Sequence, residues 1–226
     1  FFITEVDTGG SVPHLKVTNK LDADVLILDG DILVGAKQNR SATTTIIIGK
    51  HSEAVINVNC VEHGRWSYRS RTFRASERPV YAKLRSLKAR SVSENVARHA
   101  CLEADQHAVW NDISEKEMKF RMAEPAFQRS NTQAADEMYG SFDDTVRKYE
   151  KAFSAKEGQV GFVAIIGGKV AGMDVYGNPG VLSRVYNTGL RSYILDAIEQ
   201  SYDKDGKPCS GDTRRKVNTF VAGLLK

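Results

Sequence analysis

Short runs of β-branched residues alternate with turn signals along the first third of the chain. The runs are HLKVTN, DVLIL, DILVGA, TTTIII, AVINVN and WSYRSRTF. Turn residues such as Asp29-Gly30-Asp31 and His63-Gly64 separate them. Strands that recur about every 8–12 residues are typical of an antiparallel β-sandwich or barrel. Since strand side chains alternate between faces, Ile56, Val58 and Cys60 share the face that we expect to be buried.

The pattern changes to helical spacing after a basic connector at residues 74–90. One helical pattern begins at about Ser91, and a second covers about residues 132–155. Two β runs then flank Gly167-Gly168 and predict a hairpin, because glycine tolerates the positive φ of tight turns. Asn178-Pro179 predicts the start of a further helix, with asparagine as the cap.

These patterns predict an α+β protein. An antiparallel β-sandwich-like part with its basic connector occupies residues 1–90. Residues 91–226 are helices with a β-hairpin at about 159–176, packed against the first part as one compact unit. The chain also begins inside an apparent strand, so we expect its natural N-terminus to lie upstream.

Composition points to a globular protein of the cytoplasm. The 226 residues are 41% hydrophobic and 27% charged. No apolar run approaches the roughly 20 residues of a membrane span, and no signal-peptide pattern opens the chain. The three cysteines, Cys60, Cys101 and Cys209, are odd in number and widely spaced. They favour a reducing compartment over a disulfide framework, and they give no zinc pattern.

Basic residues are concentrated between Arg65 and Arg90, where nine Lys or Arg residues oppose Glu77 alone. A local basic stretch on a nearly balanced protein favours an anionic ligand. Nucleic acid is a weaker hypothesis, because the sequence pI of about 8.9 is moderate and no nucleic-acid motif is present.

The first candidate site is the stretch GAKQNR. Four hydrogen-bonding side chains, Lys37, Gln38, Asn39 and Arg40, directly follow an apolar strand. Such groups suit a phosphate or a sugar, and arginine can bind an oxyanion in a bidentate manner. The alternative interpretation is a strand end that becomes a solvated loop.

The second candidate is CVEHGRWSYRSRTF. Glu62 is a candidate acid/base, with Arg65 and Arg69 as anion ligands and Trp66 as a stacking surface. If the stretch is a strand, Arg65, Arg69 and Arg71 share one face, and Trp66 and Tyr68 lie on the other. Two alternatives stay open: a plain hairpin turn, and a buried polar network in which these groups pair with one another.

Farther along, Gln106 and Trp110 are spaced by one helical turn beside Asp105, and all three are candidate ligand-binding residues. His99 and His107 lie too far apart on a straight helix to share one metal ion with Glu103. We therefore predict no metal site. The sequence also lacks a P-loop, HExxH, GxSxG and a dinucleotide-binding GxGxxG.

GAKQNR, CVEHGRW and DQHAVW together resemble an uncharacterised, mainly bacterial family, the ADP-ribosylglycohydrolase-and-rhodanese-phosphatase-associated protein domains. The resemblance implies a link to NAD-derived or ADP-ribose-type compounds, and no mechanism. The residues that carry it are Gly35, Lys37, Gln38, Asn39, Arg40, Cys60, Glu62, Gly64, Arg65, Trp66, Asp105, Gln106 and Trp110.

From these features we expect a protein that binds or processes a nucleotide-like phosphorylated ligand, without a cofactor. The alternative is a non-catalytic β-sandwich module that binds a ligand or another protein. Whether the chain is an enzyme, and whether it forms homo-oligomers, stay open.

Overall fold

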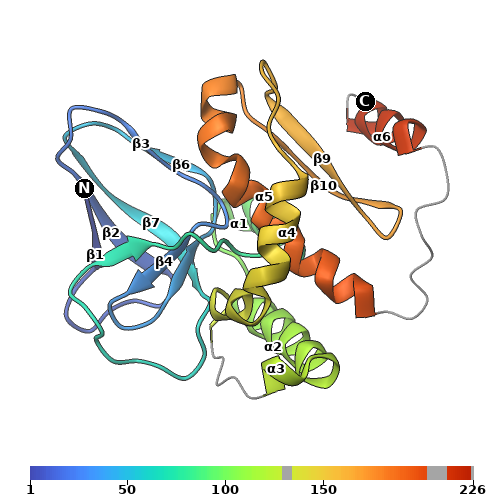
Figure 1. Ribbon diagram of the computed structural model, residues 1–226. Coiled ribbons are helices and arrows are strands. Elements are labelled where there is room, and N and C mark those ends of the chain that lie inside the picture. The colour runs from blue at the N-terminus through green and yellow to red at the C-terminus, as the bar shows by residue number, and fades with distance from the viewer. Residues whose placement is uncertain (129–133, 203–212, 225–226) are drawn as a thin grey trace. The chain divides into compact units, whose positions relative to one another are not determined.

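The computed structural model describes residues 1–128, 134–202 and 213–224 (Figure 1). The chain divides into two compact units. The first comprises Phe1–Val80 and Leu84–Ser141, and the second comprises Tyr81–Lys83 and Phe142–Lys226. Each contains both antiparallel strands and helices, so the predicted mixture of α and β structure is confirmed.

The strands of the first unit form two antiparallel sheets. A six-stranded sheet has the order β1-β2-β7-β5-β4-β8, and a separate pair joins β3 to β6. The strands are β1 (Phe2–Glu5), β2 (His14–Asn19), β3 (Val25–Ile27), β4 (Ile32–Gly35), β5 (Arg40–Ala42), β6 (Ile46–Ile48), β7 (Ser52–Cys60) and β8 (Phe73–Ala75). The edge strands β1 and β8 contact each other, so the large sheet curls almost closed, as its curvature in Figure 1 shows.

Both sheets bury their apolar faces in one core. On β7, Ile56, Val58 and Cys60 are buried, as the alternation predicted. Ile27 from β3 and Ile48 from β6 join the same core. Burying such side chains contributes about 1.5–3 kcal/mol each, which holds the small sheet against the large one. The antiparallel β-rich part is thus present, while the sandwich arrangement stays a prediction.

The predicted strand WSYRSRTF is largely wrong. Only Phe73–Ala75 is a strand, and the preceding residues have no regular structure. The chain there is tied to the β4–β5 turn instead, because the N–H of Ser67 donates to the carbonyl of Lys37 and that of Arg69 to Ala36. The expected face of aligned arginines therefore does not form.

Helices α1 (Ala82–His99), α2 (Gln106–Ala123) and α3 (Pro125–Gln128) follow the strands, and the 3-10 helix η1 (Glu137–Phe142) comes later. The helix α1 starts earlier than predicted, inside the basic stretch, because Lys, Leu and Arg are good helix formers. Ala100 adopts a positive φ of 51° and separates α1 from α2. His99, Glu103 and His107 consequently do not share one helix.

The second unit contains α4 (Asp143–Ala152), β9 (Gly161–Ile166), β10 (Lys169–Val175), α5 (Pro179–Tyr202) and α6 (Thr213–Leu224). The predicted hairpin is confirmed: Gly167 and Gly168 form its turn with φ of 55° and 75°. The start of α5 is confirmed too, because Asn178 Oδ1 accepts a hydrogen bond from the N–H of Gly180 at 2.7 Å. Helix α5 packs on the hairpin, where Phe162 contacts Tyr186 and Tyr193 edge to face.

Two predicted features fall outside the described residues, namely Cys209 and the beginning of the helix at about 132–155. In the part that the structure describes, no helix combines the length and the apolar character that crossing a membrane requires.

Candidate functional site

GAKQNR forms the tight connection between β4 and β5, and its polar side chains are buried. Gly35 ends β4 with a φ of 133°, where a Cβ would lie 2.7 Å from the carbonyl oxygen of Thr72. Arg40 begins β5. Lys37, Gln38 and Asn39 between them are all buried. The interpretation as a solvated loop is therefore wrong, because tertiary partners cover all four side chains.

Glu62 and Arg65 form the central ion pair of this region. Arg65 Nε donates to Glu62 Oε1 at 2.7 Å, and Arg65 Nη2 donates to Glu62 Oε2 at 2.6 Å. The backbone N–H of Asn39 donates to the same Oε2 at 2.8 Å. Arg69 Nη2 lies 3.7 Å from Glu62 Oε1. The carboxylate, only 2% exposed, thus joins the β4–β5 turn to the residues that follow β7.

This environment keeps Glu62 ionised. Burial by itself would raise the pKa of Glu62, but the hydrogen bonds from Arg65 and Asn39 and the charges of Arg65 and Arg69 lower it overall. A general acid must hold a proton at neutral pH, and a general base needs a free lone pair near its substrate. The catalytic role of Glu62 stays a prediction, and the function proposed below does not depend on it.

Arg65 is fully used by the protein. Besides Glu62, its guanidinium donates to the carbonyls of Gly35, Ala36 and Ser67 and to Asn39 Oδ1. Each of its N–H donors consequently has an acceptor. The arrangement matches the buried polar network considered for these residues.

Arg40 differs from Arg65 in the same neighbourhood. It is 0% exposed, and only its Nη1 atom is satisfied, by the backbone oxygen of Gln38 at 3.0 Å and by Gln38 Oε1 at 3.1 Å. Its Nε and Nη2 atoms find no acceptor among the described residues. Burial lowers the pKa of Arg40, since the nearby carboxylates compensate its charge only in part. A buried guanidinium with two unused donors has the chemistry of an oxyanion ligand.

Trp66 lies against this guanidinium. Its ring centroid is 5.3 Å from Arg40 Cζ and 5.4 Å from Lys37 Nζ, so two cations contact one indole. Lys37 Nζ also lies 5.2 Å from the ring of Tyr68 and donates to the carbonyl of Gly9. Trp66 remains 45% exposed. It therefore separates the buried Arg40 from solvent while keeping an accessible aromatic surface.

Sequence reasoning missed Glu5, which lies in the same cluster. It ends β1 on the inward face shared with Ile3, and it is buried. Its Oε1 accepts a hydrogen bond from the N–H of Lys37 at 3.2 Å. The only signal in the sequence was a charged residue at an alternating position expected to be apolar.

The other candidates lie at the same end of β7, beside Cys60 and His63. Gln106 and Asp105 have hydrogen-bond partners, whereas Trp110 Nε1 has no acceptor among the described residues. The side-chain amide of Gln106 makes two hydrogen bonds to the backbone of Cys60. The N–H of Cys60 donates to Gln106 Oε1 at 2.8 Å, and Gln106 Nε2 donates to the carbonyl oxygen of Cys60 at 2.9 Å. Asp105 is the N-cap of α2 and accepts from the N–H groups of His107 and Ala108. Trp110 packs edge to face against His63 and His107.

Cys60 is a buried thiol, fully covered by the core. Burial raises its pKa to about 11, so almost none of it is thiolate at neutral pH. This is the environment of a small hydrophobic residue.

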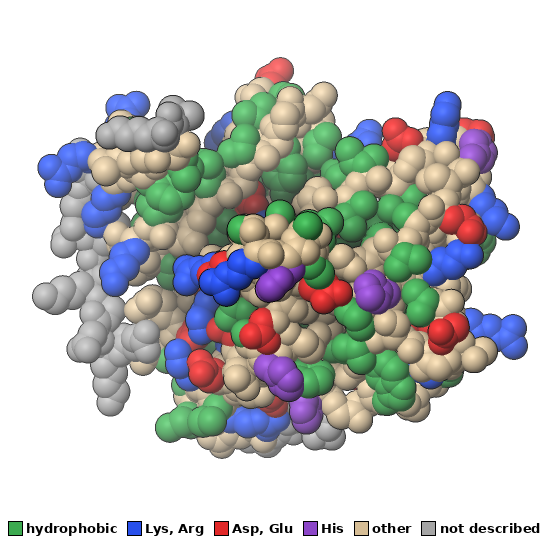
Figure 2. All heavy atoms as spheres, turned by 180° about the vertical axis from the view of Figure 1, so that it is seen from behind, with side chains coloured by type: hydrophobic (Ala, Val, Ile, Leu, Met, Phe, Trp, Pro, Cys, Tyr) green, Lys and Arg blue, Asp and Glu red, His purple; other side chains and the backbone are tan. Residues whose placement is uncertain are grey.

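The basic stretch does not form one open basic surface. Lys88 is buried, with its Nζ 2.6 Å from the carbonyl oxygen of Ala42, 2.9 Å from Ser41 Oγ and 3.2 Å from Asp29 Oδ1. On the face that Figure 2 shows, Lys and Arg side chains are interspersed with acidic and hydrophobic ones. Across the described ranges, no three His, Cys, Asp or Glu side chains are grouped as metal ligands.

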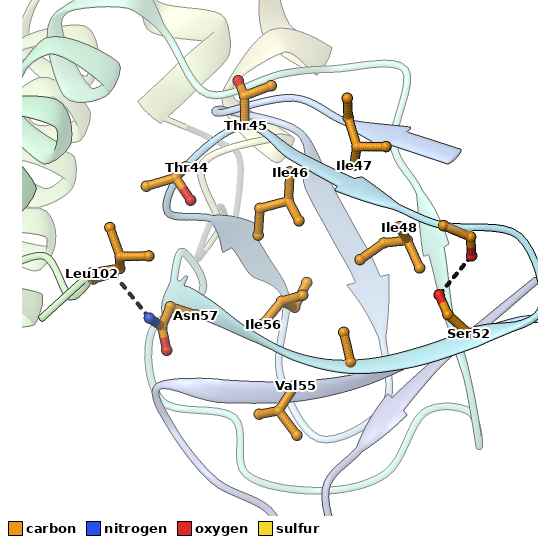
Figure 3. A pocket seen from close by; sticks show the side chains of 12 residues that line it. Thr44, Thr45, Ile46, Ile47, Ile48, Ser52, Val55, Ile56, Asn57 and Leu102 are labelled. Atoms are coloured by element: carbon orange, nitrogen blue, oxygen red, sulfur yellow. Dashed lines mark hydrogen bonds between the residues drawn. The ribbon is translucent and has the colours of Figure 1, made fainter. Parts of the chain in front are cut away.

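A separate cavity of about 480 Å³ lies between β6 and β7 (Figure 3). Its walls include Ile46, Ile48 and Ile56, and Leu102 closes one end, where its carbonyl accepts from Asn57 Nδ2 at 3.2 Å. None of the described side chains that line it is charged, and none is a predicted site residue. Its lining mixes apolar side chains with the uncharged polar ones of Thr44, Thr45, Ser52 and Asn57, whereas the cluster at Arg40 has the chemistry of an anion site.

The family comparison gives the expected result. A family model described as the ARG and Rhodanese-Phosphatase-superfamily-associated Protein domain matches residues 1–225. The chain belongs to this family. The resemblance seen in GAKQNR, CVEHGRW and DQHAVW is thereby confirmed. The family's name records an association with ARG proteins and with the rhodanese-phosphatase superfamily, and it specifies no ligand. Searches of curated proteins and of solved structures each found no match.

Proposed function

We propose that this domain binds, and in its biological setting processes, an anionic nucleotide-like ligand of the NAD-derived or ADP-ribose type. The observation that carries the proposal is Arg40. A guanidinium that is 0% exposed and has two unused donors is costly to bury, and an oxyanion would satisfy it. The family's association with ARG proteins supports the same ligand class.

The surroundings of Arg40 support a nucleotide more than free phosphate. Trp66 presents a partly exposed aromatic ring directly beside the guanidinium, and stacking on such a ring contributes about 1–3 kcal/mol per base. Lys37 adds a second positive charge at the same ring. Anion binding and base stacking can thus occur within one small region.

The test is a thermal-shift panel with ADP-ribose, NAD, AMP and phosphosugars. Binding to the folded state at a hundredfold excess over Kd adds about 2.7 kcal/mol of stability. We expect a rise in Tm for the wild type that is lost in Arg40→Ala and kept in Arg74→Ala. Arg74 is an exposed arginine on β8 and controls for the loss of one positive charge. A well-folded wild type that no compound stabilises contradicts the proposal.

The alternative function is a non-catalytic module that binds a ligand or another protein. The cavity between β6 and β7 favours it, because Ile47 and Val55 are exposed large hydrophobic residues at its rim. Binding of anions without product formation, or binding only of apolar probes, distinguishes this module from the processing function.

A further inference from the structure

Two buried side chains of opposite charge keep unused hydrogen-bonding capacity in the same cluster. Glu5 is 7% exposed, and its Oε2 atom has no donor in the described part of the chain. Arg40 is 0% exposed and keeps Nε and Nη2 unused. Native proteins pair nearly all such buried groups, so each unpaired one needs an explanation.

Both groups adjoin Trp66. Arg40 Cζ lies 5.3 Å from the Trp66 ring centroid. A Cβ on Gly10 would lie 3.3 Å from Glu5 Oε2 and 3.4 Å from Trp66 Cζ2. The unused acceptor and the unused donors therefore both lie close to Trp66, and the charge of Glu5 acts on Arg40.

Gly10 allows this close approach. Its φ is 76°, and a side chain there would also come within 3.1 Å of Lys37 Cδ. Only glycine adopts this conformation without strain and leaves the space free. The backbone at Gly10 thus packs closely against the side chains of Glu5, Lys37 and Trp66.

Arg40 and Glu5 require different hydrogen-bonding groups in a ligand. Arg40 offers donors and requires an acceptor such as a phosphate oxygen. Glu5, when ionised, only accepts, so it requires an N–H or O–H group. Free phosphate would satisfy Arg40 while placing a second negative charge near Glu5. A phosphorylated sugar carries both the oxyanion and a hydroxyl donor.

We propose that Glu5 is a specificity-determining ligand-binding residue, which selects anions that carry a neighbouring hydroxyl donor over the bare anion. This inference rests on the proposed anion site at Arg40. It assigns to Glu5 a sugar contact, for which the amides of Gln38 and Asn39 were the other candidates. Those two amides already bond to Glu62, Arg65 and Arg40 within the protein.

The experiment is a calorimetric titration with ribose 5-phosphate and inorganic phosphate. The proteins are the wild type, Glu5→Gln, Arg40→Lys and the control Glu53→Gln, which removes an exposed carboxylate from β7. We expect the wild type to bind ribose 5-phosphate at least tenfold more tightly than phosphate. Glu5→Gln should lower the ribose 5-phosphate affinity at least tenfold while leaving phosphate affinity unchanged or higher. Glu53→Gln should resemble the wild type.

Three results overturn the inference. The first is a wild type without the tenfold preference, which decides the question even if Glu5→Gln fails to fold. The second is a Glu5→Gln protein that binds both probes more tightly by the same factor, because Glu5 then only repels anions. In the third, Glu5→Gln binds like the wild type. The proposed anion site itself is judged by Arg40→Lys, which should weaken both probes. If Arg40→Lys changes neither, the anion site fails along with the inference.

Discussion

Replacing Arg65 with methionine tests whether the Glu62–Arg65 pair holds the β4–β5 turn to the chain that follows β7. Methionine keeps much of the length of arginine and removes its charge and its donors. Glu62 would then be a 2% exposed carboxylate supported only by the N–H of Asn39 and by the more distant Arg69. Three backbone carbonyls would each lose one hydrogen bond as well.

The expected cost is large for a single substitution. Removing one partner of a buried ion pair costs about 3–5 kcal/mol, because the other charge stays buried without compensation. This is a substantial share of the about 5–15 kcal/mol by which a folded protein is stable. The double variant Glu62→Gln/Arg65→Met removes both charges. It should cost less than the sum of the two single changes, by about 1–3 kcal/mol.

The assay is urea denaturation at pH 7 of the wild type, both single variants and the double variant. The pH dependence gives a second readout. The folded-state pKa of Glu62 is lowered from 4.5, so its stabilisation is complete above the unfolded-state pKa and is lost as the pH falls through the folded-state pKa. The gap between wild type and Glu62→Gln should therefore shrink on acidification. An Arg65→Met cost below about 1 kcal/mol, or strictly additive variants, would refute the structural role.

Three further predictions concern neighbouring residues. Cys60, with a pKa of about 11, should resist iodoacetamide at pH 7.5 while the partly exposed Cys101 reacts, as peptide mass mapping will show; equal labelling contradicts this. Gln106→Ala should cost about 1–3 kcal/mol in urea denaturation, since the backbone of Cys60 loses two bonds, and Gln106→Glu should destabilise as well, because it sets a carboxylate oxygen against the carbonyl of Cys60. Gly35→Ala should destabilise by more than Gly64→Ala, which shares the positive φ but has no atom within 4 Å of its new Cβ; equal midpoints would refute the steric reasoning.

The elements with regular periodicity were predictable from the sequence. On strand β7, Ile56, Val58 and Cys60 are buried as the alternation predicted, because that face packs on the core, although Asn59 is buried as well. The hairpin at Gly167-Gly168 and the start of α5 were predictable for a local reason, since glycine and asparagine-proline determine backbone geometry within a few residues.

The burial of the polar site was not predictable in the same way. Glu5 meets Lys37 across 32 positions of sequence, and Gln106 meets Cys60 across 46. No local pattern contains such contacts. The predicted strand after Gly64 failed for a related reason, because its backbone bonds to the β4–β5 turn instead of a neighbouring strand. The alternation of side chains predicts which residues share a face only where the segment is paired with a neighbouring strand by backbone hydrogen bonds.

Hydrogen-bond satisfaction separates architecture from function in this cluster. Arg65 and Arg40 carry the same charge and both lie near Glu62. Arg40 lies in GAKQNR and Arg65 in CVEHGRW, the two motifs that predicted the site. Arg65 has an acceptor for each donor, so a ligand could bind it only by breaking bonds that hold the turn in place. Arg40 and Glu5 are only partly satisfied, because Arg40 Nε and Nη2 and Glu5 Oε2 have no partner among the described residues. Folding alone gives little reason to retain them, because apolar residues of similar volume would often be as stable. Their retention is explained if a ligand supplies the missing partners. The search for that ligand should therefore begin at Arg40 and Glu5, with the Glu62–Arg65 pair as its support.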